Sequence, residues 1–110
     1  MTKRLICIYF TLIISSGNLL FSQDFNIQPY LQDATPKSIF ILWETTDGEE
    51  SIVEWGLTDT LGSSASGGSA NNNGGYLHEV QLENLDRFTK YYYRVKTETL
   101  VSDIFSFKEM

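Results

Sequence analysis

The chain has 110 residues, which suits a single domain, and a formal net charge of -6. An acidic surface repels phosphate backbones, so the charge argues against nucleic acid as a partner. The sequence contains one cysteine, which excludes an intramolecular disulfide as the framework of the fold.

The first 22 residues have the layout of a secretory signal peptide. Lys3 and Arg4 form a short basic start, and the largely apolar run Leu5–Ile14 follows. This run is shorter than the roughly 20 residues that a membrane span needs. We therefore predict a signal peptide at 1–22 and a secreted domain, extracellular or periplasmic, at 23–110. No membrane span is expected after cleavage; the alternative is an uncleaved anchor.

Removal of this segment makes the domain more acidic and takes away its cysteine. Cys7 leaves with the segment, as do Lys3 and Arg4, so six basic residues face 14 acidic ones and the net charge becomes -8. A domain of this size without disulfides folds only around a well-filled core. The aromatic residues, 14% of the chain, are the side chains that can fill it.

The domain shows no helical period but short β-rich runs separated by turn residues, which predict an antiparallel β-sandwich of about seven strands. Pro29 cannot donate a ladder hydrogen bond, so the first run is an edge strand. The segment 62–75, GSSASGGSANNNGG, is predicted to be an irregular loop. The predicted strands are Asn26–Gln32, Ser38–Thr45, Ser51–Leu57, Tyr76–Leu85, Thr89–Glu98 and Ser102–Lys108, with a weak one near Thr60–Ser64.

Side chains alternate across a strand, so one buried residue identifies the inward face. With Trp43 inside, Ile41 and Ile39 are inside too. The same reasoning applied to each strand predicts a common core formed by Trp43, Val53, Trp55, Leu82, Tyr91, Tyr93, Phe105 and Phe107.

Three consecutive tyrosines occur in TKYYYRVK, residues 89–96. Tyr91 follows the end of the preceding strand at a spacing that suits a tyrosine corner, in which the hydroxyl bonds to upstream backbone. Tyr93 shares its inward face, whereas Tyr92 and Arg94 face outward. The tyrosines are therefore predicted to be two core residues and one surface residue, not a binding platform.

Several motifs carry a resemblance to a known family: PYLQ at 29–32, SIFILWET at 38–45, SIVEWG at 51–56, HEVQLENL at 78–85, TKYYYRV at 89–95 and SDIFSFK at 102–108. In this order the chain resembles the N-terminal, fibronectin type III-like domain of purple acid phosphatases and related secreted metallophosphoesterases. The resemblance implies an immunoglobulin-like sandwich. It covers about residues 27–108. The chain departs from the family at Arg87 and Phe88, where a Pro-Gly pair usually precedes the threonine of the corner.

The resemblance places the chemistry of the family in a following domain. There, Asp, Asn, Tyr and His ligands hold a dinuclear metal centre that hydrolyses phosphate esters, so acid phosphatase activity is implied only for a full-length parent. A dinuclear site needs several nitrogen ligands, and this chain has a single histidine. We therefore predict no catalytic residue, no metal ligand and no cofactor in this chain.

Two groups of residues qualify as candidate sites. His78 shares its phase with Val80 and Leu82 and is interpreted as a structural histidine at the sandwich edge. Phe40 and Leu42 lie opposite Trp43 on their strand, and an exposed apolar pair is typical of a docking surface. The alternative for the pair is a sheet face packed under its own edge loops, and the two interpretations are equally supported.

Two functions follow. In the first, the chain is the non-catalytic leading domain of a secreted purple acid phosphatase-like enzyme, here as a fragment or truncated product. Its partner is then a metallophosphatase catalytic domain, in cis or separately encoded. In the second, it is a stand-alone secreted module that binds protein or glycan. The abrupt end after the last strand and the Phe40–Leu42 pair favour the first function.

Overall fold

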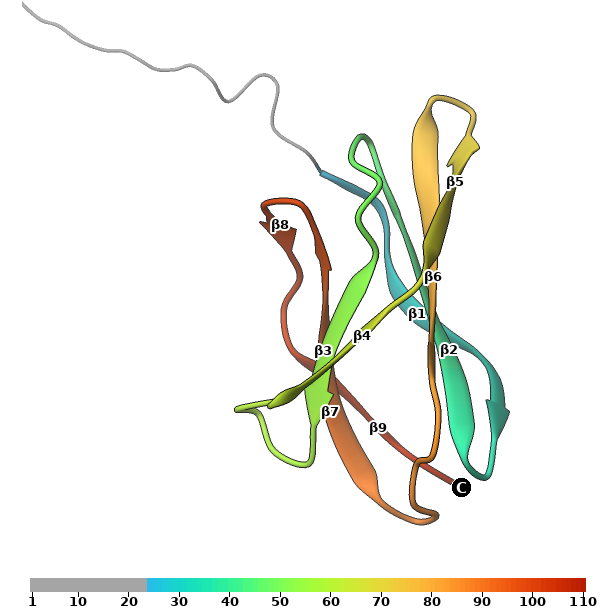
Figure 1. The fold of residues 1–110 in the computed structure, drawn as a ribbon, viewed down its shortest axis with the longest axis vertical. Coiled ribbons are helices and arrows are strands. Elements are labelled where there is room, and N and C mark those ends of the chain that lie inside the picture. Colours follow the sequence, from blue (N-terminus) through green and yellow to red (C-terminus); the bar gives the residue numbers. More distant parts are fainter. Residues whose placement is uncertain (1–23) are drawn as a thin grey trace, which may run out of the picture.

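The computed structural model describes residues 24–110, which form two antiparallel β-sheets packed face to face (Figure 1). The predicted all-β sandwich is confirmed, with nine strands instead of about seven. The predicted signal peptide at 1–22 lies outside the described residues. No helix long and apolar enough to span a membrane occurs between residues 24 and 110.

The first sheet has four strands and the second has five. The first contains, in spatial order, β1 (Phe25–Thr35), β2 (Ser38–Thr45), β6 (Gly75–Leu82) and β5 (Gly68–Asn72). The second contains β4 (Ser63–Ser66), β3 (Ile52–Gly56) and β7 (Lys90–Thr97), and β7 also pairs with β8 (Leu100–Val101) and β9 (Phe105–Lys108). β1, which carries Pro29, is an edge strand as predicted.

The core lies between the sheets and is built by inward residues of β2, β3, β6, β7 and β9. Six of the residues expected there are buried in one cluster: Trp43, Val53, Leu82, Tyr91, Tyr93 and Phe107. Trp55 and Phe105 are only partly buried and pack against the cluster. Trp55 pairs with the small Ser63 of β4, which leaves its ring incompletely covered.

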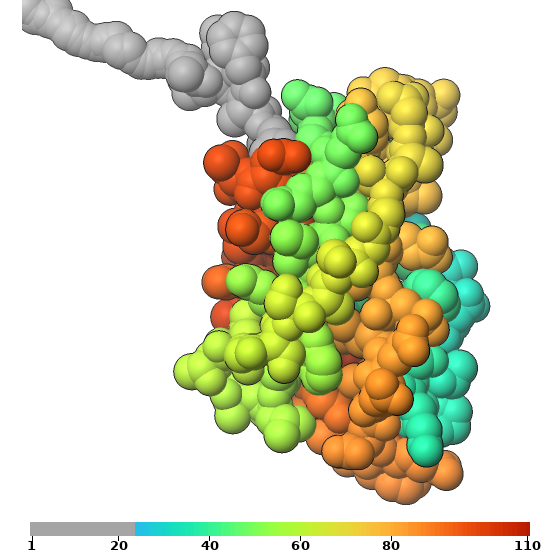
Figure 2. Space-filling model, in the orientation of Figure 1, coloured from blue at the N-terminus to red at the C-terminus, as the bar shows by residue number. Residues whose placement is uncertain are grey.

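The segment predicted as an irregular loop instead forms β4 and β5, so that prediction was wrong. β4 pairs with β3 in one sheet and β5 pairs with β6 in the other, so the chain crosses between the sheets at Gly67. In Figure 2 this segment, yellow-green to yellow, runs diagonally over the face of the molecule. A Cβ on Gly67 would lie 2.0 Å from the Glu79 carbonyl oxygen, so only glycine fits there. Strand pairing uses backbone groups that every residue except proline carries, which explains how small polar residues form these strands.

The tyrosine corner is present. The Asp86 N–H donates to the Tyr91 hydroxyl oxygen over 2.7 Å, and the Tyr91 side chain is buried. Tyr93 is buried as well, and burial raises the pKa of Tyr93 to about 12. Tyr92 is half-buried on the other face of β7, where the Lys90 ammonium lies 5.1 Å from its ring centroid.

In the turn before the corner, Arg87 and Phe88 replace the usual Pro-Gly pair, so a residue other than glycine takes the last position. Phe88 has a φ of 57°, the left-handed conformation that glycine adopts without a Cβ penalty. The corner therefore keeps its hydrogen bond although a bulky residue occupies the position. The Phe88 side chain is 70% exposed, so little packing compensates for the conformation.

We expect Tyr91→Phe to lower the free energy of unfolding by about 1–3 kcal/mol, because the Asp86 N–H loses its acceptor. Tyr92→Phe removes a hydroxyl on the outer face and should change stability by less than about 0.5 kcal/mol. Urea denaturation of residues 24–110 measures both values. A larger loss for Tyr92→Phe would contradict the assignment of the corner.

We expect Phe88→Gly to raise the free energy of unfolding by up to about 1 kcal/mol. The left-handed conformation costs a non-glycine residue about 1–2 kcal/mol, which exceeds the extra entropy of about 0.5–1 kcal/mol that glycine loses on folding. Phe88→Val should be destabilising, because a β-branched residue tolerates this conformation least. Equal melting temperatures for the two variants would argue against strain at this turn.

Candidate functional site

His78 is the natural candidate for catalysis. It was predicted to lie at the sandwich edge, but it lies in the interior. Its side chain is 0% exposed and stacks on Trp43, with ring centroids 5.1 Å apart. Its Nε2 lies 2.8 Å from the Thr45 hydroxyl oxygen and its Nδ1 lies 2.7 Å from that of Ser51. Both ring nitrogens are thus engaged with hydroxyl groups, an arrangement that suits a structural histidine.

His78 faces the core because β2 and β6 pair with Trp43 directly opposite His78. Two neighbours in adjacent strands share one face of the sheet, so a buried Trp43 brings His78 inside with it. Burial lowers the pKa of the His78 imidazole below its usual value of 6.5. The neutral ring is therefore the form that the core holds.

The side chains of residues 24–110 do not form a cluster of metal ligands. Among residues 24–110, no three His, Cys, Asp or Glu side chains come together to hold a metal ion. The acidic turn after β2 is partly used for structure, since Glu50 Oε1 accepts a hydrogen bond from the Glu98 N–H over 2.9 Å. A hydrolytic metal centre would need several such ligands around one point.

The apolar pair of β2 differs from the prediction. Phe40 and Leu42 lie outside the buried core cluster, but Leu42 is only 7% exposed and Phe40 is half-buried. Leu42 belongs to an inner strand, with Tyr30 paired to it on one side and Glu79 on the other. These neighbours cover it. The expected exposure is therefore wrong for Leu42, and a docking role for the pair stays a prediction.

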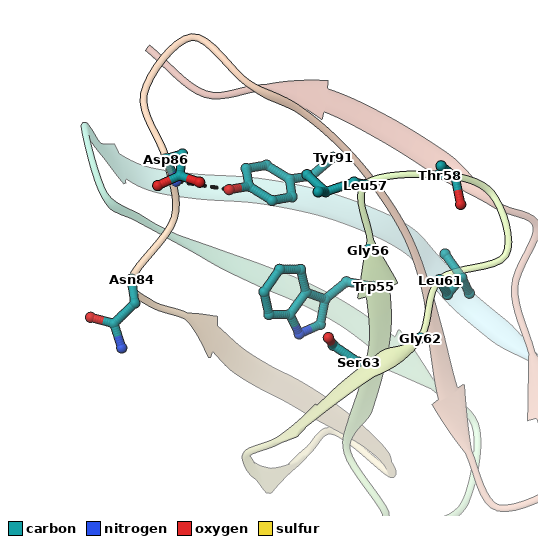
Figure 3. Close-up of a pocket in the computed structure, with 10 residues that line it drawn as sticks. All are labelled: Trp55, Gly56, Leu57, Thr58, Leu61, Gly62, Ser63, Asn84, Asp86 and Tyr91. Atoms are coloured by element: carbon teal, nitrogen blue, oxygen red, sulfur yellow. Dashed lines mark hydrogen bonds between the residues drawn. The ribbon is translucent and has the colours of Figure 1, made fainter.

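A pocket of about 540 Å³ lies at the end of β3, beside the tyrosine corner (Figure 3). Its wall includes the half-buried Trp55, with Asn84 and Asp86 contributed by the turn between β6 and β7. A Cβ on Gly56 would lie 1.9 Å from the Leu61 carbonyl oxygen, so glycine allows the following loop to fold back and form the rim. The pocket can admit a small ligand but brings no nucleophile and base together.

A second pocket, of about 240 Å³, lies between the two sheets where β1 faces β9. We call this opening the β1–β9 seam, defined by Leu31, Asp33, Phe107, Glu109 and Met110. Glu109 is 1% exposed there, although it is a charged residue. The strand pattern carried a signal for its burial, since Glu109 continues the inward phase of Phe105 and Phe107.

These features define the class of protein: an antiparallel β-sandwich whose single histidine belongs to its core. Comparison with protein families makes the assignment specific. The model of the purple acid phosphatase N-terminal domain matches residues 25–109. The chain therefore belongs to this family, as its motifs indicated. No curated protein matches the chain.

Solved structures support the fold independently. The sensor domain of the anti-sigma factor RsgI4 from Pseudobacteroides cellulosolvens, in its long form, aligns with a TM-score of 0.59 and 17% identity. The alignment covers 79% of this chain and 90% of that domain. The short form of the same sensor domain gives a TM-score of 0.59 at 15% identity, covering 78% of this chain and 94% of that domain. At this identity the likeness concerns the fold alone.

We expect the stability of the domain to depend on pH through His78. Its folded pKa is lowered, so its contribution is fully present above the unfolded value of about 6.5 and is lost as pH falls through the folded pKa. The free energy of unfolding should therefore decrease between pH 7.5 and pH 5. Denaturation of wild type and of His78→Gln at both values measures this. A pH dependence that persists unchanged in His78→Gln would assign it to other groups.

Proposed function

We propose that this chain is the non-catalytic leading domain of a secreted purple acid phosphatase-like metallophosphoesterase. The family match over residues 25–109 carries the proposal. The substrate chemistry then belongs to a separate metallophosphoesterase domain, in cis or separately encoded, which holds the dinuclear metal centre. The leading domain supplies a rigid surface against which that domain packs.

The side chains of the sandwich support a role in packing over one in catalysis. Both ring nitrogens of His78 are hydrogen-bonded, one to Thr45 and the other to Ser51. The one ion pair among the described residues, Arg94 to Glu54 at 2.6 Å, joins neighbouring strands on a partly exposed face. Such a pair contributes little to stability and forms no site.

Secretion is part of the proposal and rests on the amino-terminal residues. The basic start at Lys3 and Arg4 followed by an apolar run is typical of a signal peptide. The domain is also suited to an oxidising compartment, because the part that remains after cleavage has no thiol to be oxidised.

The proposal is tested with two measurements on purified residues 24–110. The chain alone should not hydrolyse p-nitrophenyl phosphate, with or without iron, zinc or manganese. It should bind a separately produced purple acid phosphatase catalytic domain, measured by isothermal titration calorimetry. Turnover that scales with protein, or failure to bind that catalytic domain, would overturn the proposal.

A further inference from the structure

The β1–β9 seam holds a carboxylate that is incompletely satisfied. Glu109 Oε1 accepts a hydrogen bond from the Met110 N–H over 3.2 Å. Glu109 Oε2 is buried and has no hydrogen-bond partner among residues 24–110. A buried charged oxygen without a donor is costly, so its presence in a native fold calls for an explanation.

The backbone holds this carboxylate in the seam. The Glu109 N–H donates to the Thr89 carbonyl oxygen over 2.8 Å, which extends the pairing of β9 with β7 by one step. Side chains alternate along an extended chain, so Glu109 points to the same side as the buried Phe107. This phase places the Glu109 side chain inside the seam, where it is 1% exposed.

The groups around the seam leave Glu109 without a cation. Lys108 lines the same pocket but points to the other side of its strand, and the described residues contain no ion pair to Glu109. The other charged group of the pocket is Asp33, which is acidic too. The rim also carries accessible apolar side chains, with Leu31 38% and Met110 57% exposed.

We propose that the β1–β9 seam is the docking site for the metallophosphoesterase domain, which inserts an arginine or lysine side chain to meet Glu109 Oε2. This inference rests on the function proposed above and names the contact surface. A cation supplies both the missing donor and the opposite charge, and an arginine can bond both carboxylate oxygens. Leu31 and Met110 then pack against apolar groups around that cation and exclude water.

The test uses Glu109→Gln, which keeps the shape of the side chain and removes its charge. The matched control is Glu49→Gln, the same change at an exposed residue in the turn after β2, far from the C-terminus in Figure 1. In residues 24–110 alone, Glu109→Gln should raise the melting temperature by roughly 4 °C or more, because an unpaired buried charge is gone. Glu49→Gln should leave it unchanged.

Binding to the catalytic domain should change in the opposite direction. Glu109→Gln should raise the Kd by about tenfold or more, because a buried basic group loses its partner, while Glu49→Gln should have no effect. Glu109→Met, which has a similar length and no charge, should give the same pair of results. If wild type binds and Glu109→Gln binds equally well, the seam is not the docking site. If wild type itself does not bind, the proposed function fails and this inference fails with it.

Discussion

The indole N–H of Trp43 donates to the Thr97 hydroxyl over 2.9 Å, and this hydrogen bond crosses from one sheet to the other. A second buried link runs from His78 in β6 to Ser51, just before β3. No cysteine occurs among residues 24–110. The relative position of the two sheets therefore depends on directional polar bonds inside an apolar core, where such bonds are strong because water is excluded.

This construction limits what the interior can do. Trp43, His78, Thr45 and Ser51 form one connected group, and their side-chain polar atoms are all hydrogen-bonded inside the sandwich. Any partner must therefore be recognised at the periphery. There the sandwich offers the Trp55 pocket and the β1–β9 seam, of which only the seam contains a buried polar atom without a partner.

The strands with large alternating side chains were predictable from sequence, and β2 has the predicted bounds, Ser38–Thr45. The tyrosine corner was predictable because its spacing is local. The β4–β5 segment was missed because its strands are held by backbone pairing, and its small polar residues carry no pattern of alternating large side chains. Leu42 was misjudged for a related reason: alternation gives the face of a strand, whereas exposure depends on which strands lie on either side. The unpaired carboxylate of Glu109 could not be predicted, because the sequence does not show that no cation among residues 24–110 lies beside it in the fold.

The crossing at Gly67 has a mechanical consequence. One continuous segment is hydrogen-bonded to both sheets along the β4–β5 side, so separating the sheets there stretches this segment and breaks the β3–β4 or the β5–β6 ladder. On the opposite side, β1 and β9 end in different sheets and do not pair with each other. The two sheets are therefore joined along β4–β5 and are not joined between β1 and β9. A side chain bound between β1 and β9 would link the sheets on that side as well and would stiffen the whole domain.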